Sequence, residues 1–270
     1  MTKKTVEIFR SYKQKKEKIT VLTAYDYTFA KIFDKENIDA LLVGDSLGMV
    51  IKGDKNTLGV TMDEIVYHTK AVAKAANQAL VIADMPFLSY QTSIYDAVRN
   101  AGRLVQKAGA ECVKLEGTKH LGAIKAIIKA EIPVIGHLGL TPQSILQMGK
   151  YKIQAKGNNE IQQLISDAKQ LQDIGVVAIV LECIPTEVAK DISKNLQIPT
   201  IGIGAGKYCD GQVLVFQDMF NLYIEMKPKF VKTFSDIGSK VSQGVSDYIK
   251  EIKAQTFPDD IHSFHLKNDK

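Results

Sequence analysis

The chain has 270 residues, of which 45% are hydrophobic and 24% charged, proportions that are typical of a folded globular protein. The formal net charge of +5 is small and spread along the chain, so it does not indicate a nucleic-acid-binding protein. The sequence has no apolar run that could cross a bilayer, and its basic N-terminus lacks the apolar segment of a secretory signal. The three cysteines have no metal-ligand spacing, and they fit a reducing, cytosolic compartment.

Short apolar runs alternate with amphipathic stretches along the first half of the chain, which predicts buried parallel strands joined by helices. A solvated helix is expected first, with Val6, Ile8 and Phe9 as its apolar residues. For a later helix, Thr61 is the expected N-cap and Glu64 completes a capping box. We expect strands at residues 19–25, 41–45, 80–84 and 112–116, and helices at 27–35, 63–78, 93–108 and 120–129.

The same alternation continues through the second half of the chain. We expect strands at residues 134–137, 178–182, 198–204 and 211–216, and helices at 160–174, 186–195 and 237–254. Seven or eight such units with short connections favour a (β/α)8 TIM barrel over an open doubly wound sheet, which usually has fewer strands. The prediction is therefore an α/β fold, in which residues 1–270 form a single barrel domain with an extra N-terminal helix.

Three connections contain several glycines. Those at residues 46–60 and 138–157 are long, and each is either a loop that closes over a substrate or a plain connection. The segment Gly202–Gly206 lacks the spacing of a dinucleotide-binding fingerprint. It either binds a phosphate or lets the backbone approach a flat ring closely.

Five of the expected strands end on a residue that can do chemistry. In α/β barrels, active sites are built at the carboxyl ends of the strands, so these side chains are expected to converge. An acidic residue that recurs at this position is also hard to explain by packing. The five residues are Asp45, Asp84, Glu116, His137 and Glu182.

Three of these strand ends carry carboxylates on consecutive strands: Asp45, Asp84 and Glu116. Adjacent strands lie about 4.8 Å apart, so the three carboxylates can meet at one side of the barrel mouth. Like charges at that spacing repel unless a cation lies between them, and an all-oxygen donor set is the preference of Mg²⁺. The alternative for each acid taken singly is a helix N-cap on the following loop.

The remaining candidates would face this group of carboxylates. Lys114 lies two residues before Glu116, so both side chains point to the same side of their strand. Lys114 is either the partner of a neighbouring carboxylate or a cation for a substrate carboxylate or oxyanion; a Schiff-base role is less favoured. A carboxylate that is not a metal ligand can act as a general base, which suits Glu182. His137 is either a satisfied polar group or part of the same site.

Six segments, in this order, resemble the ketopantoate hydroxymethyltransferase family, and the resemblance extends over about residues 3–260. None of the segments is diagnostic by itself, but together they are highly specific. They are Thr23–Asp26, Val43–Val50, Ala83–Tyr90, Val113–Gly117, Gly136–Gln143 and Ile201–Gly206.

The resemblance implies a barrel of the phosphoenolpyruvate/pyruvate-binding type and a Mg²⁺-dependent transferase of pantothenate biosynthesis. The implied reaction transfers a hydroxymethyl group from 5,10-methylenetetrahydrofolate to 3-methyl-2-oxobutanoate and gives 2-dehydropantoate and tetrahydrofolate. It also implies a cytoplasmic homodecamer with small-molecule substrates and with neither nucleic acid nor membrane as a partner. The implied roles are Mg²⁺ ligation by Asp45, Asp84 and Glu116, substrate binding by Asp45, Ser46, Asp84 and Lys114, and proton abstraction by Glu182. We also expect His137 to bind and position a substrate.

Two other functions compete with this interpretation. The first is a carbon–carbon lyase or mutase of the same superfamily, but such enzymes often carry a catalytic cysteine on a mobile loop, and residues 138–157 contain none. The second is a non-catalytic protein that binds a 2-oxo acid. It should have lost part of the acidic set, which this chain retains.

Overall fold

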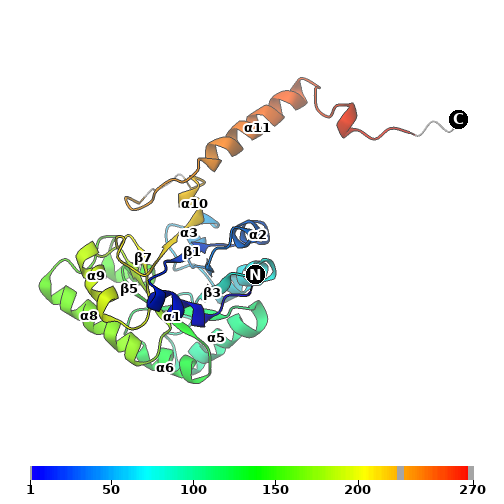
Figure 1. Ribbon diagram of the computed structural model, residues 1–270. Helices are drawn as coiled ribbons and strands as arrows, with labels where there is room; N and C mark the ends of the chain where they lie inside the picture. The colour runs from blue at the N-terminus through cyan, green and yellow to red at the C-terminus, as the bar shows by residue number, and fades with distance from the viewer. Residues whose placement is uncertain (1, 224–227, 267–270) are drawn as a thin grey trace. The chain divides into compact units, whose positions relative to one another are not determined.

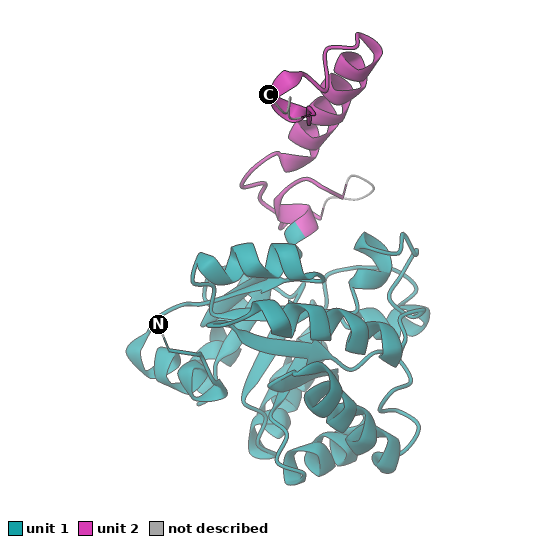
Figure 2. Cartoon of the chain, turned by 90° about the vertical axis from the view of Figure 1, so that its right-hand side faces the viewer, with its two compact units in different colours: residues 1–216 teal, residues 217–270 magenta. Residues whose placement is uncertain are grey.

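The computed structural model describes residues 2–223 and 228–266. The chain divides into two compact units, residues 1–216 and residues 217–270 (Figure 2). The first unit contains all eight strands, and the second contains the longest helix of the described chain. The assignment of residues 1–270 to a single domain stays a prediction.

The eight strands of the first unit are all parallel and close into a barrel in sequence order, with the first strand paired to the last (Figure 1). The predicted TIM barrel is therefore confirmed. The strands are β1 (Ile19–Thr23), β2 (Ala40–Val43), β3 (Leu80–Asp84), β4 (Cys112–Glu116), β5 (Val134–Gly139), β6 (Ala178–Glu182), β7 (Thr200–Ile203) and β8 (Gly211–Leu214).

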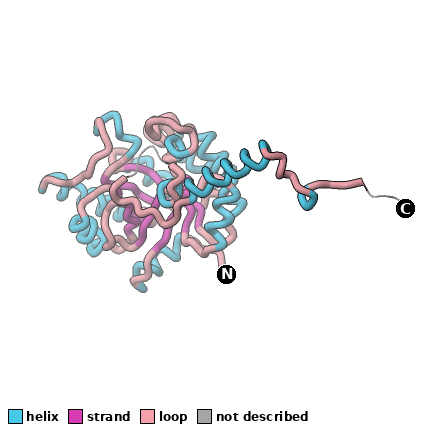
Figure 3. The backbone as a smooth tube through the Cα atoms, turned by 90° about the horizontal axis from the view of Figure 1, so that it is seen from above, coloured by secondary structure: helices cyan, strands magenta, loops and turns pink. Residues whose placement is uncertain are grey.

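Helices of the first unit surround these strands, and the predicted N-terminal helix is present (Figure 3). None of the helices in the described ranges is both long enough and apolar enough to cross a bilayer. The helices of the first unit are α1 (Val6–Lys15), α2 (Tyr27–Lys35), α3 (Leu47–Val50), α4 (Met62–Ala75), α5 (Ile94–Ala108), α6 (Leu121–Lys129), η1 (Pro142–Ser144), α7 (Ile145–Met148), α8 (Asn158–Asp173) and α9 (Thr186–Asn195). The chain continues with α10 (Phe216–Met219), α11 (Ile237–Lys253) and η2 (Asp260–His262).

Local hydrogen bonds define the ends of the predicted helices. The capping box of α4 is present, since Thr61 Oγ1 accepts from Glu64 N and Glu64 Oε2 accepts from Thr61 N. Ser93 caps α5 by accepting from Asp96 N at 3.0 Å. The same helix ends at Gly109, which has a φ of +80°. These caps satisfy N–H groups that the first helical turn leaves without partners.

The structure differs from the sequence prediction in two respects. First, the long connections contain the one-turn helices α3, η1 and α7, whose length is too short for an apolar period to reveal them. Second, β7 covers only Thr200–Ile203 of the predicted strand 198–204, and residues 204–210 lead to β8 without a helix, as predicted. Gly204 and Gly206 have φ values of +62° and +78°, and a Cβ at Gly206 would collide with the side chain of Thr186. Close packing of the backbone therefore accounts for this Gly-rich segment.

The centre of the barrel is filled by apolar side chains from all eight strands. Strand side chains alternate between the two faces, so residues two positions further along point to the same side. The side chain of Asp84 therefore points to the same side as that of Ile82, and the side chain of His137 points to the same side as that of Ile135. The apolar residues that the strands contribute to this core are Ile19, Val21, Ala40, Leu42, Leu80, Ile82, Cys112, Ile135, Ala178, Val180, Ile201 and Val213.

Candidate active site

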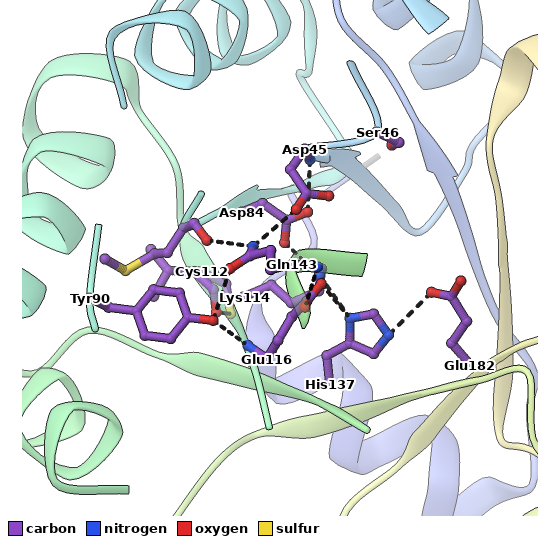
Figure 4. Close-up of polar contacts among 12 residues, drawn as sticks. Asp45, Ser46, Asp84, Tyr90, Cys112, Lys114, Glu116, His137, Gln143 and Glu182 are labelled. Carbon is purple, nitrogen blue, oxygen red and sulfur yellow. Dashed lines mark hydrogen bonds and ion pairs between the residues drawn. The ribbon is translucent and has the colours of Figure 1, made fainter. Parts of the chain in front are cut away.

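Above this apolar core, the carboxyl ends of β2 to β6 bring a group of charged side chains together (Figure 4). Each of the five most buried members is 2–6% exposed. The predicted convergence of strand ends is confirmed for these residues. They are Asp45, Asp84, Lys114, Glu116 and His137.

Each of the three carboxylates has one oxygen held by an N–H group. Asp84 Oδ2 accepts from Asp45 N at 3.0 Å, and Asp45 Oδ2 accepts from Gln143 Nε2 at 2.9 Å. Glu116 Oε2 accepts from Gln143 N at 3.1 Å. These contacts fix how the carboxylate groups are turned.

The second oxygens of these carboxylates are held differently. Asp84 Oδ1 and Glu116 Oε1 are buried, and each faces a basic side chain instead of an amide or hydroxyl donor. Asp84 Oδ1 lies 2.7 Å from Lys114 Nζ, and Glu116 Oε1 lies 3.4 Å from His137 Nδ1. Buried carboxylate oxygens on three neighbouring residues are the ligand chemistry that Mg²⁺ prefers.

The three carboxylates are spaced more widely than the ligands of a bound ion. Within residues 2–223 and 228–266, no three His, Cys, Asp or Glu side chains lie close enough to hold an ion. The donor set therefore fits a hard cation in its chemistry, and the carboxylates would have to move closer around it.

Burial and repulsion between the carboxylates raise the pKa values of Asp45 and Asp84. Burial and the negative charges of Asp84 and Glu116 raise the pKa of Asp45 to about 8. Burial also raises the pKa of Asp84, although the charge of Lys114 opposes this shift. A cation among these carboxylates would relieve both effects.

Lys114 remains charged in this environment. Burial by itself would lower its pKa, but the negative charges of Asp84 and Glu116 outweigh burial and raise the pKa above its ordinary value. A protonated amine is not a nucleophile. Lys114 is therefore suited to hold an anionic oxygen and unsuited to form an imine.

His137 lies between the carboxylate group and the end of β6. Its Nδ1 atom is 3.2 Å from Lys114 Nζ, and its Nε2 atom is 3.2 Å from Glu182 Oε2. Burial and the charge of Lys114 lower the pKa of His137, but hydrogen bonds to Glu116 and Glu182 outweigh them and raise it to about 9. The Glu182 side chain is 16% exposed, so it is more accessible than the imidazole.

Ser46 lies beyond Asp45 in Figure 4, away from the centre of the carboxylate group. Its Oγ atom is 2.7 Å from the hydroxyl of Tyr25, which is 1% exposed. The carbonyl oxygen of Tyr25 in turn lies 2.6 Å from His68 Nδ1. The position of the Ser46 hydroxyl is therefore fixed by Tyr25, a buried residue on the connection that follows β1.

Two residues of the site, Gln143 and Tyr90, are not among those predicted from the sequence. The hydroxyl of Tyr90 donates to Gln143 Oε1 at 3.0 Å and accepts from Glu116 N at 3.3 Å. Both residues lie in segments that carry the family resemblance, but neither ends a strand and neither is ionised at neutral pH. A prediction based on charged residues at strand ends therefore does not include Gln143 and Tyr90.

The connection that carries Gln143 is anchored to β6. Leu140 N donates to the carbonyl oxygen of Glu182 at 2.9 Å. Gly139 has a φ of +92°, and a Cβ at this position would collide with the same carbonyl and would lie 2.8 Å from Ile184 Cγ2. Only glycine suits both the conformation and the space. The turn at Gly139 thus directs the connection back over the carboxylates.

The chain was compared with protein families and with curated proteins. A family described as ketopantoate hydroxymethyltransferase matches residues 3–260. The 3-methyl-2-oxobutanoate hydroxymethyltransferase of Clostridium botulinum (strain Loch Maree / Type A3) is 56% identical over 266 residues, which are 98% of this chain and 97% of that protein. The protein of the same name from Clostridium acetobutylicum is 53% identical over 265 residues, 98% of this chain and 96% of that protein.

Solved structures resemble the chain in fold. A phosphonopyruvate hydrolase has a TM-score of 0.63 and 12% identity, with 99% of this chain and 93% of that chain covered. A 2,3-dimethylmalate lyase of the PEP mutase/isocitrate lyase superfamily has a TM-score of 0.60 and 13% identity, with 98% and 90% covered. These likenesses support the predicted barrel fold.

Proposed function

Because the chain belongs to the ketopantoate hydroxymethyltransferase family, we propose that it transfers a hydroxymethyl group to 3-methyl-2-oxobutanoate. We further propose 5,10-methylenetetrahydrofolate as the donor and Mg²⁺ as the cofactor, with 2-dehydropantoate and tetrahydrofolate as products. Support comes from relatives of that name that are more than half identical to this chain over nearly its full length. The single observation that carries the proposal is the buried group of three carboxylates, which lies beside Lys114 and is joined to Glu182 by His137.

In this proposal, the oxo acid binds in front of the carboxylates. Asp45, Asp84 and Glu116 would hold the cation, which supplies Lewis acidity at the keto oxygen when it is bound. The ammonium group of Lys114 would contact the negative oxygens of the substrate, since its pKa keeps it charged. Ser46 would donate a hydrogen bond to the substrate carboxylate.

Glu182 would act as the general base that removes the proton from C3 of the oxo acid. His137 holds Glu182 Oε2 at 3.2 Å, and this contact leaves the other carboxylate oxygen to face the substrate. The charged imidazole and Lys114 would then balance the negative charge that develops as the enolate forms. The connections that follow β2 and β5 would exclude water, which would otherwise reprotonate the enolate.

The enolate carbon would form the new carbon–carbon bond with the methylene carbon of the donor. That methylene carbon is joined to two folate nitrogens, and both of these bonds break, with each electron pair staying on its nitrogen. Water supplies the hydroxyl group of the product, and the two nitrogens take up the proton lost from C3 and the remaining proton of water. One tetrahydrofolate and one 2-dehydropantoate therefore form in each turnover.

The direct test measures 2-dehydropantoate from 3-methyl-2-oxobutanoate and methylenetetrahydrofolate, using enzyme treated with EDTA and desalted, with and without added Mg²⁺. We expect no turnover without metal and full recovery when Mg²⁺ is added. Undiminished turnover in the metal-free enzyme would refute the metal assignment. Binding of the oxo acid in calorimetry without any folate-dependent turnover would support the non-catalytic alternative.

The cytoplasmic location and decameric assembly that the family resemblance implies stay predictions. Sedimentation of the purified chain tests the assembly. The lyase or mutase alternative predicts cleavage of a 2-oxo acid without folate, so assays that omit folate separate it from the proposed transfer.

A further inference from the structure

Gln143 makes two of the three N–H contacts that hold the carboxylates of the site. Three N–H groups hold one oxygen each on Asp45, Asp84 and Glu116, and two of the three belong to Gln143. Its side-chain amide holds Asp45 and its main-chain N–H holds Glu116. Gln143 is 5% exposed and lies in η1, on the connection after β5.

The hydrogen bonds around the Gln143 amide fix its orientation. Nε2 donates to Asp45 Oδ2 at 2.9 Å and to the carbonyl oxygen of Met85 at 3.0 Å. Because a carbonyl oxygen can only accept, the NH₂ end of the amide must face Met85 and Asp45. Oε1 accepts from the hydroxyl of Tyr90 at 3.0 Å and from Gln91 Nε2 at 3.4 Å. Both donor hydrogens of the amide are thus used.

We propose that Gln143 is a positioning residue for the cation site, and that it sets the affinity for the divalent cation by fixing the Asp45 and Glu116 carboxylates. This inference rests on the proposed function, because it concerns the same cation. Holding one oxygen of each carboxylate by an N–H group would leave its other oxygen for the cation as the carboxylates close around it. Partners that orient the ligands of a metal typically contribute about 10–100-fold to its affinity.

The chemistry of this position favours glutamine over other polar residues. A lysine or arginine would donate to Asp45 but would compete with the cation for the carboxylates. A glutamate would place a fourth negative charge and an acceptor against Asp45 Oδ2 and the Met85 carbonyl. An asparagine is one methylene shorter and would not reach both acceptors. Glutamine donates two hydrogen bonds and adds no charge.

The test compares Mn²⁺ binding, followed by the EPR signal of the free ion, in wild-type, Gln143→Met and Tyr90→Phe proteins. Methionine has nearly the length of glutamine and no donor, and every variant keeps the main-chain N–H. Gln147→Met is the matched control, since Gln147 lies on the same connection, is exposed, and contacts Lys119 rather than the carboxylates. The melting temperature of each metal-free protein is recorded alongside.

We expect Gln143→Met to raise the dissociation constant for Mn²⁺ by about 10-fold or more. Tyr90→Phe should also raise the dissociation constant for Mn²⁺, but by a smaller factor. Gln147→Met should change this constant by less than about twofold. We also expect excess Mg²⁺ to restore kcat of Gln143→Met, because the carboxylates remain in place. A merely structural defect would lower the melting temperature without such rescue.

Two results would overturn the proposal separately. Wild-type protein that binds Mn²⁺, together with Gln143→Met that binds it within about twofold, removes the role of Gln143 and leaves the cation site intact. Wild-type protein that binds no Mn²⁺ refutes the cation site, and the role of Gln143 with it. If Gln143→Met does not fold, Gln143→Asn is judged by the same criteria.

Discussion

His137 Nε2 lies 3.2 Å from Glu182 Oε2, although neither residue is the register partner of the other. On the adjacent strands β5 and β6, His137 pairs with Val180 and Glu182 pairs with Gly139. The contact is therefore diagonal, and it links the carboxylate group to the more exposed end of β6. It also gives the candidate base a fixed orientation.

Replacing Glu182 by Gln should slow proton exchange at C3 of 3-methyl-2-oxobutanoate by about 10²–10⁴-fold, the range expected for loss of a general base. The measurement is loss of the C3 proton NMR signal in D₂O, with Mg²⁺ and without folate. Glu187→Gln is the control, because Glu187 lies in the first turn of α9 and has no part in the carboxylate group. Wild-type exchange in Glu182→Gln would exclude Glu182 as the base.

Replacing Lys114 by Met should raise KM for the oxo acid, lower kcat and reduce the free energy of unfolding. Lys114 Nζ is 2.7 Å from Asp84 Oδ1 in a buried pair, and removing one partner of such a pair typically costs about 3–5 kcal/mol. Adding Asp84→Asn should restore part of the stability without activity. Steady-state kinetics and urea unfolding measure these effects, and a change confined to KM for folate would contradict the assignment.

Gly139→Ala should lower both stability and kcat, because the added Cβ meets the carbonyl of Glu182 and displaces the end of β6. We expect a loss of about 1–3 kcal/mol beyond that of the control. Gly149→Ala is that control, since Gly149 also has a positive φ, +74°, but has no atom within 4 Å of an added Cβ. Equal losses in both variants would show that backbone conformation alone matters at Gly139.

Asp34→Asn should lower the free energy of unfolding by about 1–3 kcal/mol at pH 7, through loss of charge-assisted hydrogen bonds. Asp34 accepts from the backbone N–H groups of residues 77, 78 and 79. Burial raises the pKa of Asp34, but these three bonds outweigh it and hold the pKa below its ordinary value of 3.8.

A lowered pKa in the folded protein means that Asp34 contributes its full stabilisation above its ordinary pKa and loses it as the pH falls through the folded-state value. Urea titrations from pH 7 downward should therefore show the difference between wild-type and Asp34→Asn shrinking below about pH 4. Asp173→Asn, at the C-terminal end of α8, serves as the control, because the Asp173 side chain is 56% exposed. A difference that stays constant with pH would exclude the ionised carboxylate as the cause.

Much of the fold and part of the site follow from local patterns in the sequence. The period of two residues along each strand places Lys114 on the same side as Glu116, and the β-rich runs identify all eight strands. Strand ends then collect Asp45, Asp84, Glu116 and His137, as the structure confirms. These features depend on neighbouring residues in the chain, so the sequence contains them directly.

The tertiary structure decided which neutral residues complete the site and how its connections run. Gln143 reaches Asp45 because the glycine turn at residue 139 and the bond from Leu140 to Glu182 direct the connection inward. Gly206 likewise lies too close to the side chain of Thr186 to accommodate a Cβ. Such contacts join residues distant in the chain, and no local period encodes them. The sequence by itself determined the strands and their charged ends; packing between connections determined how those ends are held.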